Sequence, residues 1–343
     1  MKMLFVFILL LAVVPNQVCG GGFTADKRVY VTNEQWATEP YRYLLAKYVE
    51  EDGIEKNRCT ANMVCGKIVT ARHCIHDDCH NSNEIHMFKA YDGTKLQAKC
   101  ENMGDYVLDQ IGAKEGKNGD WAILEPIDEH KQFVVDNSIC NFPSHTAGSS
   151  GRVYAAGFGG LKIMSDAEIE SLRRAYVYFL ENHIEYESGL KRVATISAAK
   201  NEEEGLYLED GKNSTAFIYD LWCDHYGWPA GTKLNTGWIC TGTNYKEMFD
   251  GVSVMWLSDD TDKMKSSKCA YSYKDMTSDG LYVDMDCQIW GGNSGGGVYL
   301  PGKKSYFVAI QTMGPGYIGG KNHASAGATT FVASDVFKSK LEE

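Results

Sequence analysis

Three short segments carry side chains that could act together as a nucleophile, a base and an orienting acid. Ser294 lies among glycines in GGNSGGGV, His73 follows the run IVTA, and Asp120 begins the segment DWAIL. Each is weak evidence alone, because glycine-rich loops are usually turns and single histidines or aspartates are usually not catalytic. The three residues occur in the order His, Asp, Ser, each at the edge of a strand-like run, and this conjunction indicates one shared site.

The chemistry that such a set could carry is nucleophilic attack by a serine. A serine hydroxyl is a poor nucleophile near neutral pH, so a base must take its proton, and the imidazole of His73 suits that role. The carboxylate of Asp120 would hold the imidazole in the right tautomer and stabilise its charged form. The glycines before Ser294 allow the backbone N–H groups of Gly292 and Ser294 to point at one spot, which would bind the oxyanion of a tetrahedral intermediate.

The elements that must position these residues are short strands. Runs rich in Val, Ile, Tyr and Phe, punctuated by Gly and Asn, dominate both ends of the chain and predict an all-β barrel or sandwich. These runs are ANMVCGKIVTA, DWAILEPI, RVYAAGFG, GLYVDMDC, SYFVAIQTMG and ATTFVASDVF.

The middle of the chain, residues 161–268, differs in character and is interpreted as a mixed α/β insertion within the β domain. Ser165 and Glu168 have the spacing of a capping box, and apolar residues then recur on one helical face. The segment LWCDHYGWPAGTKLNTGWICTG is aromatic and holds two cysteines, so we expect it to build a small cysteine-stapled core. The N-glycosylation sequon at 213–215 is relevant only in a eukaryotic host.

The first residues are typical of a secretory signal peptide, which we expect to span residues 1–20. A short basic start precedes an apolar run, and Val18 and Gly20 are small enough for a cleavage site. Cleavage after Gly20 would leave the domain 21–343 and remove Cys19 from the 11 cysteines of the chain. The even set of ten that remains predicts disulfides in a secreted or periplasmic protein.

Charge and hydropathy limit the classes of partner that the chain can bind. The formal net charge of −11 argues against nucleic acid and against anionic membranes. No segment after the signal approaches the length of a transmembrane helix. We therefore expect a soluble monomer whose partners are protein or peptide substrates, and we expect no cofactor.

The same segments resemble those of a known family. CTANMV…IVTARHCI, DWAILEPI and MDCQIWGGNSGGGVY, with the start DKRVYVTNEQWATEPYRYLL, resemble blocks of trypsin-fold serine endopeptidases and, within that fold, of bacterial glutamyl endopeptidases. The resemblance covers roughly residues 26–160 and 280–341 and omits the insertion. It implies two perpendicular six-stranded β-barrels with a cleft between them, the triad of His73, Asp120 and Ser294, and hydrolysis of peptide bonds through an acyl-enzyme intermediate.

The specificity pocket departs from the glutamyl endopeptidases. Their histidine for the substrate carboxylate lies in the segment A-V-H-T-N-G, which corresponds here to Ala309–Gly314 and places the uncharged Gln311 at that position. A buried carboxylate without a charged partner costs several kcal/mol, so we expect a pocket that prefers a neutral residue before the cleaved bond. The alternative is an Arg or Lys preference, if Asp286 occupies the pocket floor. The residues expected to line the pocket are Ile289, Trp290, Gln311, Thr312 and Gly314.

Local spacing also predicts disulfides. Cys59 and Cys74 flank a strand, a turn and a second strand that fold back beside His73, so their side chains should meet. Weaker local pairings are Cys223 with Cys240 and Cys269 with Cys287.

Two other interpretations stay open on the sequence alone. The segment HCIHDDCHNSNEIH holds metal-ligating residue types, but its spacing fits no familiar zinc pattern, and we interpret it as a polar loop without metal. The second alternative is a catalytically silent peptidase homologue whose barrels and insertion form a binding module. All three residues of the triad are present, which favours an enzyme.

Overall fold

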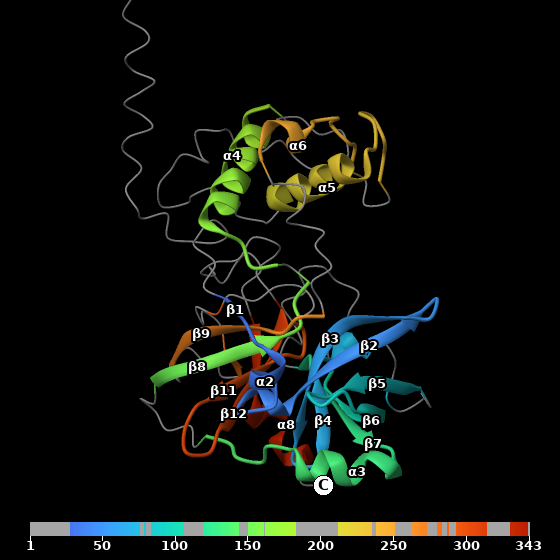
Figure 1. Ribbon diagram of the computed structural model, residues 1–343, viewed down its shortest axis with the longest axis vertical. Helices are drawn as coiled ribbons and strands as arrows, with labels where there is room; N and C mark the ends of the chain where they lie inside the picture. The colour runs from blue at the N-terminus through green and yellow to red at the C-terminus, as the bar shows by residue number, and fades with distance from the viewer. Residues whose placement is uncertain are drawn as a thin grey trace, which may run out of the picture.

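The computed structural model describes most of the β domain and the helical part of the insertion (Figure 1). The described residues are 28–75, 79, 84–105, 119–143, 150–160, 162–182, 212–234, 238–250, 262–272, 280–282, 287, 293–313 and 330–341. Within these ranges the chain forms two groups of antiparallel strands, a helical unit in the insertion, and short helices in the β domain.

The first group of strands closes into a six-stranded barrel, in the order β2-β3-β4-β7-β6-β5. Successive side chains along a strand point to opposite faces, and in this barrel both faces are apolar. Leu45 packs inside the barrel, whereas Leu44 and Ala46 pack against the second group of strands. The strands of the barrel are β2 (Leu44–Glu51), β3 (Ile54–Val64), β4 (Lys67–Thr70), β5 (Ile85–Lys89), β6 (Lys95–Met103) and β7 (Ala122–Pro126).

The second group is a sheet in the order β1-β9-β8-β11-β12-β13-β10, seven strands within the described residues. Val153, Ala155, Val298 and Val308 form the buried cluster of this sheet. The strands are β1 (Val29–Tyr30), β8 (Ser150–Gly157), β9 (Lys265–Ser272), β10 (Leu281–Tyr282), β11 (Gly297–Leu300), β12 (Tyr306–Met313) and β13 (Thr330–Ala333).

The predicted all-β class, with a closed six-stranded barrel and a second antiparallel sheet, is confirmed. The second unit differs in strand number from the expected barrel because β1, close to the expected start of the mature chain, pairs with the edge of β9. Strand β9 pairs with β8 along its whole length, from Ser150↔Ser272 to Gly157↔Lys265. Residues 265–268, which fall within the range expected for the insertion, are therefore part of this sheet.

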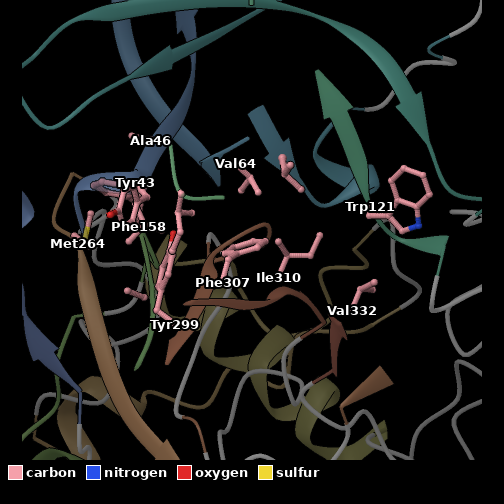
Figure 2. Close-up of a cluster of buried hydrophobic side chains, with 14 of the residues drawn as sticks. Tyr43, Ala46, Val64, Trp121, Phe158, Met264, Tyr299, Phe307, Ile310 and Val332 are labelled. Atoms are coloured by element: carbon pink, nitrogen blue, oxygen red, sulfur yellow. The ribbon is translucent and has the colours of Figure 1, made fainter. Parts of the chain in front are cut away.

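An aromatic core joins the barrel to the sheet. Ala46 and Val64 of the barrel face Phe307 and Ile310 of β12, and Tyr299 lies among them (Figure 2). The ring of Tyr299 is 5.7 Å from that of Phe307, measured between centroids. Because this shared core fixes the two groups of strands against each other, residues from both can contribute to one site with fixed geometry.

Short helices and turns complete the β domain. None of the helices in the described ranges is both long and apolar enough to cross a membrane. These elements are α2 (Asn33–Trp36), η1 (Tyr41–Tyr43), η2 (Arg72–Cys74), α3 (Asp128–Asp136), α8 (Ser334–Phe337) and η5 (Lys338–Leu341).

The helices of the insertion gather at one end of the molecule, away from the strands (Figure 1). They are α4 (Asp166–Asn182), α5 (Lys212–Tyr226) and α6 (Tyr245–Met248). The predicted capping box is present at the start of α4: the Ser165 N–H donates to Glu168 Oε2 over 2.8 Å, and the Glu168 N–H donates to Ser165 Oγ over 3.4 Å. The insertion therefore begins where the sequence signals a helix start.

The helical unit has its own core, as its aromatic composition predicts. Tyr176 and Phe179 of α4 pack on Phe217 of α5, and Trp238 and Tyr245 close the cluster. The Cys223–Cys240 disulfide joins α5 to the segment that precedes α6.

The N-terminal segment of the described chain holds both ends of the insertion. At the entry, the Arg28 guanidinium donates to the Lys162 carbonyl over 2.8 Å, and the Ile163 N–H donates to the Tyr30 hydroxyl over 3.1 Å. At the exit, the Val31 N–H donates to the Met264 carbonyl over 3.0 Å. Arg28 itself is buried, so the described chain is packed into the fold from its first residue.

Asp220 is the polar centre of the insertion core, and removing its carboxylate should loosen that core selectively. The buried carboxylate accepts hydrogen bonds from the Thr241 N–H over 2.9 Å, from Thr241 Oγ1 over 2.5 Å and from the Tyr245 hydroxyl over 2.9 Å. In Asp220→Ala the buried Tyr245 hydroxyl and the half-buried Thr241 lose this acceptor, at about 1–3 kcal/mol for a buried group left unsatisfied. Hydrogen exchange followed by mass spectrometry should show faster exchange in residues 212–250 and unchanged exchange in the barrel.

The matched control is Asp250→Ala, because Asp250 belongs to the same unit but is exposed. It should leave exchange in the insertion unchanged. Equal protection of residues 212–250 against hydrogen exchange in Asp220→Ala and the wild type would contradict the role assigned to Asp220.

Candidate active site

His73 lies in the short turn η2, directly after strand β4. The neighbouring residue Cys74 is bridged to Cys59 of β3, the disulfide that the sequence predicts. The two cysteines are 15 residues apart, and closing a loop of that size contributes about 3 kcal/mol in the chain-entropy model. The disulfide therefore ties the turn that carries His73 to the wall of the barrel.

Asp120 precedes strand β7 and is completely buried, with 0% of its surface exposed. Its carboxylate accepts two hydrogen bonds from His73: the backbone N–H donates to Oδ1 over 3.0 Å, and ring Nδ1 lies 2.8 Å from Oδ2. A carboxylate only accepts, so the hydrogen of a neutral imidazole is on Nδ1. Nε2 is then left with the lone pair that a general base needs.

Ser294 is partly exposed and lies on the turn that leads into β11. Its carbonyl accepts a hydrogen bond from the Thr60 N–H over 2.8 Å, so the turn is attached to the barrel. Thr60 follows Cys59, whose disulfide partner Cys74 follows His73. This short series of contacts brings the Ser294 turn to the same end of the barrel as the His73–Asp120 pair.

Gly295 shows why the sequence needs a glycine directly after Ser294. Its φ is +78°, in the left-handed region that side chains rarely adopt. A Cβ atom at this position would also clash with the Thr60 carbonyl and with Thr70 Oγ1. The close approach of this turn to the barrel therefore requires a residue without a side chain.

The sulfur atoms of Cys59 and Cys74 and a ring nitrogen of His73 lie within 4.8 Å of one another. Both sulfur atoms belong to the disulfide, so they offer no thiolate to a metal ion. In the polar segment after His73, residues 76–78 and 80–83 lie outside the described residues. His86 is buried on β5, with Nδ1 3.7 Å from a carboxylate oxygen of Glu84.

The structure describes only part of the expected pocket and oxyanion site. Gln311 and Thr312 lie on β12 and are buried. The backbone of Gln311 is paired with the Ser294 turn, because its carbonyl accepts from the Gly295 N–H over 2.7 Å and its N–H donates to the Gly296 carbonyl over 2.8 Å. Gly292, Ile289, Trp290, Gly314 and Asp286 lie outside the described residues.

Two buried polar residues near the turn were missed in the sequence analysis. Asn62 of β3 donates through Nδ2 to the Gly295 carbonyl over 2.7 Å, and its Oδ1 accepts from the Tyr299 hydroxyl over 2.7 Å. The available signal was the polar residue in the apolar run ANMV, where a strand buried on both faces would carry an apolar side chain.

The ten cysteines that follow the expected signal peptide are paired in five disulfides, as their even number predicts. Cys223–Cys240 and Cys269–Cys287 form as the local spacing suggests. Cys65–Cys140 and Cys79–Cys100 complete the set.

Comparison with known proteins gives similarity at the level of solved structures alone. No family model matches the chain, and no curated protein sequence matches it. A Glu endopeptidase in complex with MPD is similar with a TM-score of 0.43 and 11% identity, over 93% of this chain and 98% of that chain. The protease Anisep from Arthrobacter nicotinovorans gives a TM-score of 0.40 and 10% identity, over 88% and 96% of the two chains.

The serine endoprotease from Yersinia pestis gives a TM-score of 0.40 and 12% identity, over 92% of this chain and 66% of that chain. Because all three TM-scores lie below 0.5, the function of the chain is inferred from its own residues and their contacts.

Proposed function

We propose that the chain is an exported serine endopeptidase of the trypsin fold, with His73, Asp120 and Ser294 as its triad. The observation that carries this proposal is the buried carboxylate of Asp120, which binds both the ring and the backbone of His73. This pair lies at the end of the barrel to which the Ser294 turn is attached through Thr60. A buried acid that orients a partly exposed imidazole is the arrangement that serine activation needs.

In this mechanism Ser294 Oγ attacks the carbonyl carbon of the substrate while His73 Nε2 takes its proton. The negative charge of Asp120 stabilises the imidazolium that forms, and the N–H groups of Gly292 and Ser294 stabilise the oxyanion. His73 then donates the proton to the leaving amine, which departs and leaves an acyl-enzyme. Water, deprotonated by His73, releases the acid product and restores the Ser294 hydroxyl.

Export is part of the proposal. Five disulfides suit an oxidising compartment, and the basic and apolar start of the chain is typical of a signal peptide. The expected substrates are therefore proteins or peptides outside the cytoplasm, with no requirement for a cofactor.

We further propose that the residue before the cleaved bond is uncharged, either apolar or amide-bearing. Gln311 is buried, and its side chain can donate a hydrogen bond but carries no charge. In a peptide library scanned at this position with the wild-type protein, Glu should be disfavoured, since an unpaired buried carboxylate costs several kcal/mol and each 1.4 kcal/mol is a factor of about ten.

The same library separates the alternatives. Cleavage that favours Glu by more than about tenfold, a difference of roughly 1.4 kcal/mol, would contradict the neutral pocket. Cleavage that favours Arg or Lys would assign the pocket floor to Asp286. No cleavage of any member, with intact folded protein, would support the silent homologue and contradict the endopeptidase.

A further inference from the structure

A buried amide and a buried phenol connect the Ser294 turn to the barrel. Asn62 and Tyr299 are both completely buried, at 0% exposure. Asn62 Nδ2 donates to the Gly295 carbonyl over 2.7 Å and to the Val69 carbonyl over 3.3 Å. The Tyr299 hydroxyl donates to Asn62 Oδ1 over 2.7 Å.

These contacts leave one possible orientation of the amide. Both carbonyls can only accept, so the NH₂ group of Asn62 must face them, and Oδ1 must face the tyrosine. Burial raises the pKa of the Tyr299 hydroxyl well above its usual value, so the hydroxyl stays protonated and remains a donor at any working pH. The tyrosine therefore orients the asparagine, and the asparagine holds the carbonyl of Gly295.

The Ser294 turn is then held by the barrel and by its own sheet. On the barrel side, Asn62 binds the Gly295 carbonyl, and the Thr60 N–H binds the Ser294 carbonyl over 2.8 Å. On the side of the sheet, the Gly295 N–H donates to the Gln311 carbonyl over 2.7 Å. Thr60 and Gln311 therefore fix both polar atoms of the peptide group between Ser294 and Gly295, and Asn62 fixes the carbonyl of the next peptide group, so the backbone that carries Ser294 is held on both sides.

The surroundings show that this polar contact serves more than packing. Along β3, Ala61 and Met63 pack inside the barrel, while Asn62 faces the core shared with the sheet. Tyr299 is part of that core, between Tyr43 and Phe307. An apolar residue at position 62 would satisfy packing in such a core, whereas a buried amide is tolerated only when its hydrogen bonds are made.

We propose that Asn62 and Tyr299 are positioning residues, which hold the Ser294 turn of the second sheet in register with the His73–Asp120 pair of the barrel. This inference rests on the proposed peptidase function. Positioning of the nucleophile acts on the chemical step, because a displacement of about 1 Å can cost on the order of 100-fold in rate. Substrate binding, which depends on the pocket, should be nearly unchanged.

The test is Tyr299→Phe, which removes one oxygen atom from the core and keeps the ring. With a small peptide ester, kcat should fall about 10- to 100-fold, while KM changes less than about twofold. The second-order rate of labelling by a fluorophosphonate should fall by the same factor as kcat. Asn62→Asp, which places a carboxylate oxygen against the Gly295 carbonyl, should lower kcat further per folded molecule, as counted by active-site titration.

The matched control is Tyr43→Phe. Tyr43 belongs to the same core, with its ring 6.2 Å from that of Tyr299, but its hydroxyl binds Glu39 and not the turn. Tyr299→Phe should unfold at the lower temperature of the two variants, because it leaves the buried Oδ1 of Asn62 without its donor, whereas the Glu39 partner of Tyr43 is exposed. Tyr43→Phe should keep the wild-type kcat.

The outcomes separate the two levels of the proposal. If Tyr299→Phe loses stability but keeps the wild-type kcat, as Tyr43→Phe does, the hydroxyl of Tyr299 is only structural and the positioning role is wrong. If the wild type itself neither hydrolyses the ester nor reacts with the fluorophosphonate, the peptidase proposal fails. A rise in KM for Tyr299→Phe without a fall in kcat would also overturn the positioning role.

Discussion

Replacing Ser294 by alanine is expected to abolish peptide hydrolysis and to leave the fold intact. The hydroxyl is the proposed nucleophile, and loss of the serine of a triad costs about 10⁶-fold in kcat. The turn is held through backbone atoms that the substitution keeps: the Thr60 N–H binds the Ser294 carbonyl, and the Gln311 carbonyl binds the Gly295 N–H. Steady-state hydrolysis of a peptide ester and the circular dichroism spectrum provide the two measurements.

The control for this variant is Ser339→Ala, an exposed serine of the C-terminal turn η5. It should keep both the activity and the spectrum of the wild type. Turnover in purified Ser294→Ala at more than about one per cent of the wild-type rate would contradict the assignment of the nucleophile, since the expected loss is near 10⁶-fold.

The second large effect is expected for Asp120→Asn, which should lower kcat about 10⁴-fold. The two carboxylate oxygens both accept hydrogen bonds, one from the His73 backbone and one from Nδ1 of its ring. An asparagine can keep only one of these acceptors. If its oxygen stays with the backbone N–H, its NH₂ group faces Nδ1 and forces the hydrogen of the imidazole onto Nε2, which then cannot take the serine proton.

Asp128→Asn is the matched control, because Asp128 is also near strand β7 but 98% of its side chain is exposed. Its surface ion pair with Lys131 contributes about 0–1 kcal/mol, so activity should not change. A loss of less than about tenfold in Asp120→Asn would show that this carboxylate does not set the tautomer of His73, because the expected loss is near 10⁴-fold.

Local sequence signals were sufficient to predict contacts between residues that are close together in the chain, including the disulfide beside His73. The Cys59–Cys74 disulfide follows from a strand, a turn and a second strand, and these contacts span 15 residues. The capping box of Ser165 and Glu168 is local in the same sense, since its hydrogen bonds span three residues. Patterns of this kind depend on backbone geometry that the intervening residues themselves determine.

Contacts between distant segments could not be predicted in the same way. Asn62 and Tyr299 are 237 residues apart, and they meet only because the barrel and the second sheet share a core. Cys65 and Cys140 are 75 residues apart, brought together where Val64 bridges to Ile139. Ten cysteines permit many connectivities, and only the tertiary fold chooses among them.

The order of the strands in the second sheet could not be predicted from the sequence pattern either. The runs that the sequence analysis interprets as strands do not include β9, and β9 lies between β8 and the N-terminal strand β1. The whole insertion separates β8 from β9 along the chain, so their pairing depends on the closure of a long loop. The same is true of the N-terminal segment, whose Val31 N–H binds the Met264 carbonyl at the far end of the insertion.

The measurement that tests the central claim most directly is labelling with a fluorophosphonate, followed by mass spectrometry of the digested protein. The reagent forms a covalent bond with a serine that an adjacent base activates, so it reports the nucleophile without any assumption about substrate. We expect one adduct on the wild-type chain, on Ser294, and a strong loss of labelling in Asp120→Asn. An adduct on another residue, or a folded wild-type protein that does not react at all, would contradict the account.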